Sequence, residues 1–388
     1  MSSFGKALRC MVLAAMAPLL CGPADAQEVV RVGFVAPLSG PFGDYGRKFQ
    51  NGMKAYMKVN GQTVAGRKME VIFRDSSTGS PDMAKRLAQE LLTRDKVDVL
   101  TGFALTPDAL AVAPLSTQAK TPMVLMLAAA SGLPARFPYV TRVSYSNSQA
   151  SAPIGTWAAK SGVKKVFTIV SDYAPGIDCE TAFKKSFTSQ GGEIVGGIRV
   201  PLQTIDFAPY AQRIKDAGAD AVFIFVPSGD PMTAFMKAFN ERGLAQAGIR
   251  VLANTDLSQE YLRLMGDASL QIISGTHFFE TLDTAQNKVF QKAYRELANE
   301  PGGAIAIGGW DGMAAIYEAI KKTNGKFDGT SLMQAFRGLK IDSPRGVFLI
   351  DPDTKDVVQT IYIAKVEKRG ASYEPVVIDR YEGAKDVH

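Results

Sequence analysis

The chain has 388 residues, and its 44 Lys and Arg against 38 Asp and Glu give it a formal net charge of +6. Acidic and basic residues are interspersed, so the sequence lacks the clustered basic stripe typical of proteins that bind nucleic acid. After residue 26, no apolar run approaches the ~20 residues of a transmembrane helix. The composition therefore predicts a soluble globular protein that is long enough for two domains.

The N-terminal segment has the pattern of a secretory signal peptide. Two basic residues precede the apolar stretch MVLAAMAPLLC (11–21), and ADA (24–26) provides a small-residue cleavage pattern. We therefore expect residues 1–26 to be a signal peptide that directs the protein to the periplasm. The alternative is a lipoprotein acylated at Cys21, although the residues before this cysteine lack the small side chain that such sites use. Only Cys179 remains in the mature chain, so no internal disulfide is expected.

Strand-like and helix-like segments alternate through the first part of the mature chain. Short β-branched segments alternate with segments whose apolar residues recur at helical spacing. In chain order, we expect a strand at 29–36, a helix at 43–60, a strand at 69–75, a helix at 81–95, a strand at 97–102, a helix from 107 and a strand at 122–127. This alternation predicts a parallel sheet covered by helices on both faces.

The same pattern restarts after the polar stretch RVSYSNSQA (142–150). The expected helices lie near 149–161, 175–190, 207–217 and 230–242, and the expected strands at 164–172, 192–200, 219–226 and 249–254. They predict a second α/β domain of the same kind. After Ile273 we expect two helices that return to one of the sheets, followed by terminal β segments, at 285–298, 303–323, 346–350, 360–368 and 373–381.

The sequence lacks the common catalytic motifs. Its two histidines, His277 and His388, do not stand at a metal-ligand spacing, and a lone mature cysteine cannot build a thiolate site. No GxSxG, GxxxxGK[ST] or strand-linked GxGxxG pattern occurs. We therefore expect ligand capture rather than turnover, with no cofactor and no metal. A secreted hydrolase is the alternative, which the missing motifs disfavour.

Five ordered motifs resemble a known family. The first strand runs into the loop PLSGPFGDYG, and loops at the carboxyl ends of strands are where open α/β sheets bind ligands. The motifs are PLSGPFGDYG (37–46), RDSSTGSPDMAKRLAQELLTRDKVDVLTG (74–102), SDYAPGID (171–178), VPSGDPM (226–232) and SPRGVFLIDPDT (343–354). In this order they resemble the branched-chain amino acid class of periplasmic solute-binding proteins. These are the type I binding proteins that feed ABC importers.

This resemblance implies a fold and a mechanism. Two Rossmann-like lobes with parallel-rich sheets would be joined by a three-strand hinge, and they would close on a ligand. Lobe 1 would comprise 28–146 plus 278–347, and lobe 2 would comprise 147–277 plus 348–388. The protein would be a monomer that hands its ligand to an inner-membrane ABC permease, with no role in nucleic-acid binding. A ligand-sensing receptor of the same fold would look identical in its ligand loops.

The resemblance also places ligand contacts in the first lobe. Thr106 stands where the family has a hydroxyl residue that meets the ligand's carboxylate, and the helix that opens at Pro107 favours an anion there. Tyr45 matches an aromatic residue near the side-chain pocket. Ser39 either contacts the ligand or only shapes its turn. The next contact loop contributes three further candidates: Ala128, Ala130 and Ser131. The family usually has a threonine at the position of Ala130.

In the second lobe, Tyr173 matches the family's tyrosine that closes over the ligand. Ser228 either faces the cleft or caps the following helix. Thr255 stands near the place of the glutamate that meets the ammonium group in amino-acid binders, and Asp256 is the nearest acid. Because a buried ammonium without a counter-charge is costly, the ligand is expected to be either an apolar amino acid or an aromatic or aliphatic acid without the ammonium. Trp310 is expected in the core rather than in the ligand wall.

Overall fold

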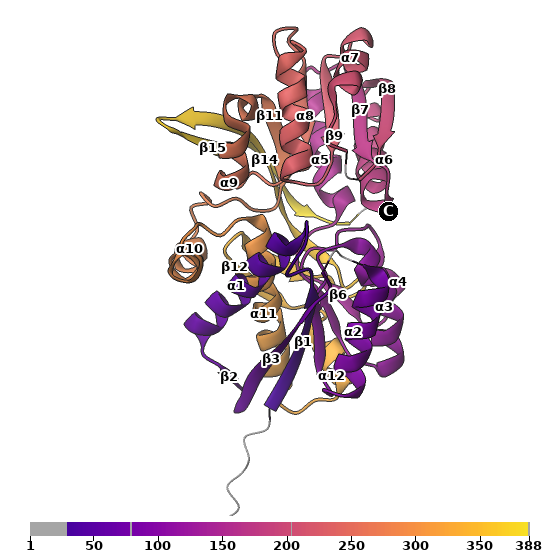
Figure 1. The fold of residues 1–388 in the computed structure, drawn as a ribbon. Helices are drawn as coiled ribbons and strands as arrows, with labels where there is room; N and C mark the ends of the chain where they lie inside the picture. The colour runs from indigo at the N-terminus through magenta and orange to yellow at the C-terminus, as the bar shows by residue number, and fades with distance from the viewer. Residues whose placement is uncertain (1–28, 78–79, 203, 387–388) are drawn as a thin grey trace, which may run out of the picture.

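The computed structural model describes residues 29–77, 80–202 and 204–386. The predicted signal peptide lies outside these residues. The described chain forms two α/β bodies, one above the other in Figure 1, and each is built around its own sheet. Most neighbouring strands run parallel, so the predicted α/β class is confirmed. Within the described residues, no helix is both long and apolar enough to cross a membrane.

The first sheet lies in the lower body of Figure 1 and has the strand order β2-β3-β1-β4-β5-β6. All of its strand pairs are parallel except β2 with β3. Its strands are β1 (Val29–Ala36), β2 (Thr63–Val64), β3 (Arg67–Asp75), β4 (Val99–Gly102), β5 (Met123–Leu125) and β6 (Val140–Arg142). The central strand β1 is buried almost throughout because helices cover both faces of the sheet.

Seven helices of the described chain belong with this sheet, and three of them come from late in the sequence. They are α1 (Gly43–Asn60), α2 (Pro81–Thr93), α3 (Thr106–Ala119), α4 (Leu133–Arg136), α10 (Ala285–Ala298), α11 (Ala304–Lys322) and α12 (Gly329–Phe336). Glycines allow α1 and α11 to approach closely. A Cβ on Gly52 would lie 2.0 Å from the carbonyl oxygen of Ala306, and one on Gly309 would lie 2.1 Å from that of Phe49. This contact fixes the position of the first turn of α11.

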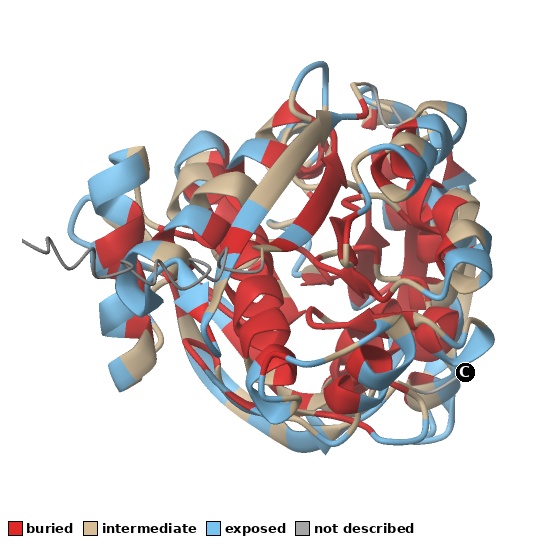
Figure 2. Cartoon of the chain, turned by 90° about the horizontal axis from the view of Figure 1, so that it is seen from below, coloured by how far each residue is buried: buried red, intermediate tan, exposed pale blue. Residues whose placement is uncertain are grey.

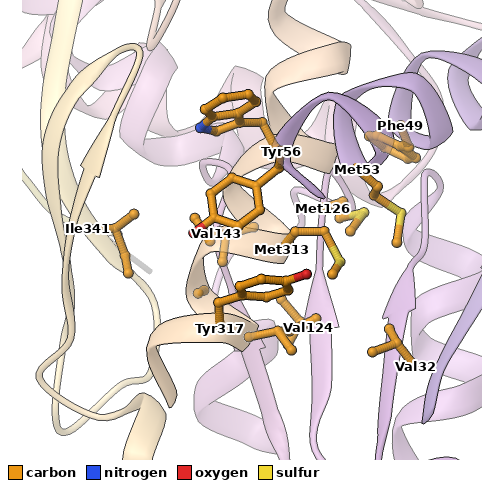
Figure 3. Close-up of a cluster of buried hydrophobic side chains, with 14 of the residues drawn as sticks. Val32, Phe49, Met53, Tyr56, Val124, Met126, Val143, Met313, Tyr317 and Ile341 are labelled. Atoms are coloured by element: carbon orange, nitrogen blue, oxygen red, sulfur yellow. The ribbon is translucent and has the colours of Figure 1, made fainter. Parts of the chain in front are cut away.

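Aromatic and sulfur-containing side chains fill the space between α1, α11 and the sheet (Figure 3). The ring of Tyr56 packs edge-on against Trp310 and Tyr317, at 5.1 Å between centroids in each case. Phe290 packs against the other side of Trp310 at 5.3 Å. Trp310 is 2% exposed, so it belongs to the core as expected. Buried residues likewise fill the interior of the molecule in Figure 2, whereas exposed residues lie on the outer surfaces of the helices.

The second sheet has the order β12-β13-β14-β11-β10-β9-β7-β8, with β15 paired to β14. Its strands from β7 to β11 lie in the upper body, whereas β12 packs beside α11 in the lower body. Its strands are β7 (Lys165–Ser171), β8 (Glu193–Val200), β9 (Ala221–Phe225), β10 (Arg250–Ala253), β11 (Ile272–Thr276), β12 (Lys340–Ser343), β13 (Gly346–Ile350), β14 (Val357–Arg369) and β15 (Ser372–Ala384). The strands from β7 to β11 are parallel, and β11 pairs antiparallel with β14. Its helices are α5 (Asn147–Lys160), α6 (Ala174–Thr188), α7 (Ala208–Asp216), α8 (Asp230–Glu241), α9 (Gln259–Met265) and the 3₁₀ helix η1 (Gly266–Gln271).

The structure also contains short elements that the sequence patterns do not predict. They are β2, β6, β11, β12, α4, α9, α12 and η1. All of these elements have eight residues or fewer. Such lengths give too few periods for a hydrophobic pattern to be recognised. None of them changes the predicted class.

Candidate binding cavity between the two sheets

A cavity of about 250 Å³ lies between the two bodies. Its walls come from loops at the carboxyl ends of strands in both sheets, the usual ligand position in open α/β folds. Apolar residues make up much of the lining: Phe42, Ala104, Leu105, Pro107, Leu127, Ala129, Pro175, Leu202, Phe225, Val226, Pro227, Ala304 and Ile305. The polar residues of the lining are Tyr45, Thr106, Tyr145, Asn147, Tyr173, Ser228, Asn254, Thr255, Asp256, Thr276 and His277.

Five helices begin at this cavity, and each contributes a residue of its first turn to the lining. These residues are Tyr45 of α1, Thr106 of α3, Asn147 of α5, Pro175 of α6 and Ala304 of α11. The N-terminus of a helix carries partial positive charge and backbone N–H groups that have no partner within the helix. The convergence of five N-termini makes the cavity favourable for an anionic group.

Charged side chains are scarce in the lining. Within the described residues, no lysine or arginine lines the cavity, and Asp256 supplies the one carboxylate. A bound anion would therefore be met by helix N-termini and neutral hydrogen-bond donors rather than by an ion pair. Neutral recognition of this kind is effective in a site from which water is largely removed, because the local dielectric is low.

Three tyrosines from different segments, Tyr45, Tyr145 and Tyr173, face the cavity. Burial raises the pKa of all three phenols, and each lies within electrostatic range of another member of the group. Among the described residues, none of the three hydroxyls has a hydrogen-bond partner. The ring of Tyr145 lies 4.7 Å from the ring of His277, and Tyr173 stacks on Phe225 at 6.3 Å. The cavity therefore offers aromatic surfaces with hydroxyl groups still available for bonding.

Two further lining residues carry buried polar atoms that lack a partner. The side-chain amide of Asn147 is 1% exposed, and neither its nitrogen nor its oxygen has a hydrogen bond within the described chain. The Nε2 atom of His277 is in the same condition, with 3% of the residue exposed. Burial, and the nearby charge of Arg345, lower the pKa of His277 well below its usual value, so its ring is neutral. Buried polar groups normally have a hydrogen-bond partner, so these atoms are available to bond a ligand or water in the cavity.

Asp256 is held in place by a small network. Its Oδ1 accepts the backbone N–H of Ser258 at 2.9 Å, and its own N–H donates to Oγ of Ser228 at 3.2 Å. Ser228 and Thr255 lie 3.3 Å apart through their hydroxyl oxygens. Burial raises the pKa of Asp256 to about 6, although Lys48 acts in the opposite direction. This residue is therefore a carboxylate in a poorly solvated position.

Six of the ten residues predicted from the sequence line the cavity: Tyr45, Thr106, Tyr173, Ser228, Thr255 and Asp256. The other four are not among the lining residues. Ser39 instead donates its hydroxyl to Asp75 at 2.7 Å, which fixes the turn after β1. Ser131 is engaged on both sides, because its backbone N–H donates to Asp178 and its hydroxyl accepts the backbone N–H of Ser148.

The loop after β5 shows why Ala128 and Ala130 do not reach the cavity. Leu127 and Ala129 line it instead, whereas Ala128 and Ala130 pack into the buried cluster that includes Leu125 and Leu133. The backbone of Ala130 still supports the site, since its N–H donates to Oγ1 of Thr106 at 3.3 Å. The predicted loop thus contributes to the cavity through the residues that alternate with the predicted ones.

Sequence reasoning did not assign Tyr145, Asn147 or His277 to the site. The first two lie in RVSYSNSQA, a polar stretch that we interpreted as a junction between domains. His277 stands at no metal-ligand spacing in the sequence, yet it lines the cavity, and its ring packs in a tilted arrangement against that of Tyr145. A polar stretch that ends at a helix N-terminus was the available signal for Asn147.

Comparisons with known proteins agree with this geometry. The sequence profile of the periplasmic binding protein family matches residues 29–371. "Leu/Ile/Val-binding protein homolog 6" of Brucella melitensis is 42% identical over 352 residues, which is 90% of each chain. A solute-binding protein of an ABC transporter from Rhodopseudomonas palustris BisB5, solved in complex with 3,4-dihydroxybenzoic acid, is 46% identical with a TM-score of 0.87. The match covers 92% of this chain and 98% of that one.

A second R. palustris solute-binding protein, solved in complex with 4-hydroxybenzoate, is 37% identical with a TM-score of 0.88. The same shares of the two chains are covered. Binding proteins of this kind capture small molecules and work with a membrane permease, and they are not enzymes. The hydrolase alternative is therefore set aside. The chain belongs to the periplasmic binding protein family, as a type I solute-binding protein of an ABC transporter.

Proposed function

We propose that the protein captures an aromatic monocarboxylate of the hydroxybenzoate class for import. The observation that carries this proposal is a cavity with aromatic walls, no lysine or arginine in its described lining, and a lining that includes first-turn residues of five helices. Two relatives that share 46% and 37% identity with this chain were solved with 3,4-dihydroxybenzoic acid and 4-hydroxybenzoate. The proposal extends their ligand class to this chain.

The carboxylate of the ligand would lie among the helix N-termini. Thr106 offers a hydroxyl in the first turn of α3, and Asn147 offers an amide that has no other partner. Neutral His277 can donate one hydrogen bond through its unpartnered nitrogen. These donors replace the guanidinium or ammonium group that would otherwise balance a buried carboxylate.

The aromatic ring would be held by the apolar and aromatic walls. Tyr173, Phe225 and Tyr145 offer flat surfaces, and aromatic pairs contribute about 0.5–1.5 kcal/mol beyond the burial of their area. The phenol groups that have no partner suit a ring with hydroxyl substituents. A volume of about 250 Å³ lies below the range of about 300–1,000 Å³ typical of drug-sized ligands, which favours a single-ring acid.

A branched-chain or other apolar amino acid is the second candidate. The names of the Brucella relatives point to it, and so does Asp256, which could balance the charge of an ammonium group. The aromatic acid remains preferred because an apolar aliphatic side chain would leave the phenol groups without partners.

Capture would proceed by closure of two lobes. We propose lobe 1 as 28–146 plus 278–347 and lobe 2 as 147–277 plus 348–388. Tyr45 and Thr106 then belong to one lobe, and Tyr173 and Asp256 to the other. A ligand that contacts both groups favours the closed state by its differential affinity for the two states. The same proposal includes export to the periplasm by a signal peptide at 1–26, action as a monomer, and no cofactor.

The direct test is a thermal-shift screen of the purified protein with 4-hydroxybenzoate, 3,4-dihydroxybenzoate, benzoate, leucine and valine. Ligand at about 1,000 times its Kd should stabilise the protein by about 4 kcal/mol. We expect this with the hydroxybenzoates and not with the amino acids. Stabilisation by leucine alone would overturn the aromatic assignment.

The site is tested by the double variant Thr106→Ala with Tyr173→Ala, which should lose the ligand-induced shift while the unliganded protein still melts cooperatively. Ser39→Ala is the matched control because Ser39 lies outside the lining. Mass spectrometry of ligand released from the purified protein would identify the natural compound. Unchanged binding by the double variant would remove this site.

A further inference from the structure

A second, polar chamber of about 370 Å³ adjoins the ligand cavity, and the two share Asp256 and Ile305 as wall residues. Its lining is rich in acids. Besides Asp256, the chamber is faced by Glu260, Glu280 and Glu300, against the cations Lys48 and Arg263. Asp256 therefore stands between an apolar ligand cavity and an acidic compartment.

One of the two cations, Lys48, already forms ion pairs with other acids. The ammonium of Lys48 lies 2.6 Å from Glu260 and 2.8 Å from Asp44. Among the described residues, neither Asp256 nor Glu280 has an ion pair. Burial raises the pKa of Glu280 to about 8, and the charge of Asp256 contributes to this shift. This end of the cavity is thus unfavourable for an anion, in contrast to the region of the helix N-termini.

Asp256 keeps unused hydrogen-bonding capacity. Its Oδ1 accepts the N–H of Ser258, whereas no described residue donates to its Oδ2. A carboxylate has about four acceptor positions, so this side chain can accept a further hydrogen bond. The Asp256 side chain lines the ligand cavity, which places this capacity within reach of a bound molecule.

We infer that Asp256 is a specificity-determining residue that accepts a hydrogen bond from a phenolic hydroxyl of the ligand and excludes a second carboxylate. This inference rests on the proposed function. A phenol has a pKa of about 10, so it is neutral and can donate at pH 7. Its bond to an ionised acceptor is charge-assisted and therefore strong. A carboxylate in the same position would face like charges across a poorly solvated gap.

A purely structural role for Asp256 is the competing explanation, because its carboxylate also shapes the turn before α9 through Ser258. Asp256→Asn separates the two roles. The amide oxygen of the new side chain can still accept the Ser258 N–H, but the negative charge is gone. Asp230→Asn is the matched control, since Asp230 is exposed in the same body and does not line the cavity.

The experiment is titration calorimetry of the intact mature protein at pH 7.5 with 4-hydroxybenzoate, benzoate and benzene-1,4-dicarboxylate. In the wild type, 4-hydroxybenzoate should bind at least tenfold more tightly than benzoate and at least a hundredfold more tightly than the dicarboxylate. In Asp256→Asn, the affinity for the dicarboxylate should rise at least tenfold, and the preference for the hydroxyl group should fall at least threefold. Asp230→Asn should keep the wild-type ratios.

The outcomes separate this inference from the proposed function. If the wild type binds none of the three aromatic acids, the proposed function itself fails. If the wild type binds them but Asp256→Asn keeps the same order and ratios, only the role of Asp256 is overturned. Circular dichroism and the melting temperature of the unliganded variant establish that it is folded. If Asp256→Asn proves unfolded, Asp256→Glu replaces it: it retains the charge and should keep excluding the dicarboxylate, and tight binding of the dicarboxylate would overturn the inference.

Discussion

Arg142 and Asn147 lie close together in the sequence and are equally buried, but their polar atoms meet opposite conditions. Arg142 is 0% exposed, and its guanidinium bonds to both oxygens of Asp356, at 3.0 and 2.8 Å. Its remaining N–H groups donate to three backbone carbonyl oxygens, those of Ala128, Ala130 and Tyr145. The amide of Asn147 is 1% exposed and has no partner at either atom within the described chain.

This difference distinguishes residues that stabilise the structure around the site from residues that are available to bind a ligand. A buried polar group normally contributes to folding only when its hydrogen bonds are made. Arg142 satisfies this condition and also fixes the loop whose Leu127 and Ala129 line the cavity. Asn147 lines the cavity, and the hydrogen-bonding capacity of its amide is unused, so the amide remains available to a ligand. Substitution should therefore affect stability at one position and affinity at the other.

The largest effect is expected for Arg142→Met. It leaves Asp356 buried without its counter-charge, and breaking one side of a buried pair costs about 3–5 kcal/mol. Urea unfolding monitored by circular dichroism should show this loss. The double variant Arg142→Met with Asp356→Leu should recover part of it, because no uncompensated charge remains.

The matched control is Arg74→Met, which breaks a pair with Asp95 at 2.6 Å. Arg74 and Asp95 are partly exposed, at 24% and 18% of their side chains, so the cost should be about 1 kcal/mol or less. Equal losses of stability for Arg142→Met and Arg74→Met would contradict the larger cost expected for breaking the buried pair.

For Asn147→Ala we expect the reverse pattern. Removing a buried group that has no partner relieves its desolvation cost and also loses some packing, so the free energy of unfolding should change by no more than about 0.5 kcal/mol. Ser146, not Asn147, caps the helix through the N–H of Gln149, so the cap remains. The affinity for 4-hydroxybenzoate should fall at least tenfold, which is about 1.4 kcal/mol, in calorimetric titration. A variant that unfolds easily yet binds normally would make Asn147 a structural residue.

The contrast also explains which parts of the fold and of the site could be predicted from the sequence alone. Alternating apolar patterns predicted the two sheets because long helices and buried strands repeat their period several times, as in α1 and β1. The order of the elements then placed the ligand loops at strand ends. Thr106 and Tyr173 could be named because the resemblance to the family identifies them, and each lies directly before or within the first turn of a helix that follows such a strand.

Other parts of the site depend on contacts that no local pattern records. His277 and Tyr145 pack against one another although they are far apart in the sequence. Ala128 and Ala130 pack into a buried cluster, and their carbonyl oxygens accept hydrogen bonds from Arg142, whereas Leu127 and Ala129 line the cavity. Whether a buried amide is satisfied is likewise a property of the folded chain.

The smallest expected effect concerns Glu280. Its hydrogen bonding is intermediate between that of Arg142, whose polar atoms are all bonded, and that of Asn147, whose amide has no partner within the described chain. Glu280 is largely buried, and among the described residues its carboxylate accepts hydrogen bonds only from the N–H of Gln259, at 3.3 Å to each oxygen. Because its pKa is raised to about 8 from about 4.5, the native state keeps a proton that the unfolded chain releases between these values. Stability should therefore fall as the pH rises through this window.

Between pH 7.0 and 8.0 the wild type should lose about 1 kcal/mol of stability, measured by urea unfolding at each pH. Glu280→Gln should abolish most of this slope, because the uncharged side chain no longer titrates. Asp256 contributes little in this range, since its pKa is about 6. Glu296→Gln, an exposed change on α10, should keep the wild-type slope. A stability that stays flat or rises in the wild type would mean that Glu280 is ionised in the native protein, and the acidic chamber would then hold a counter-ion.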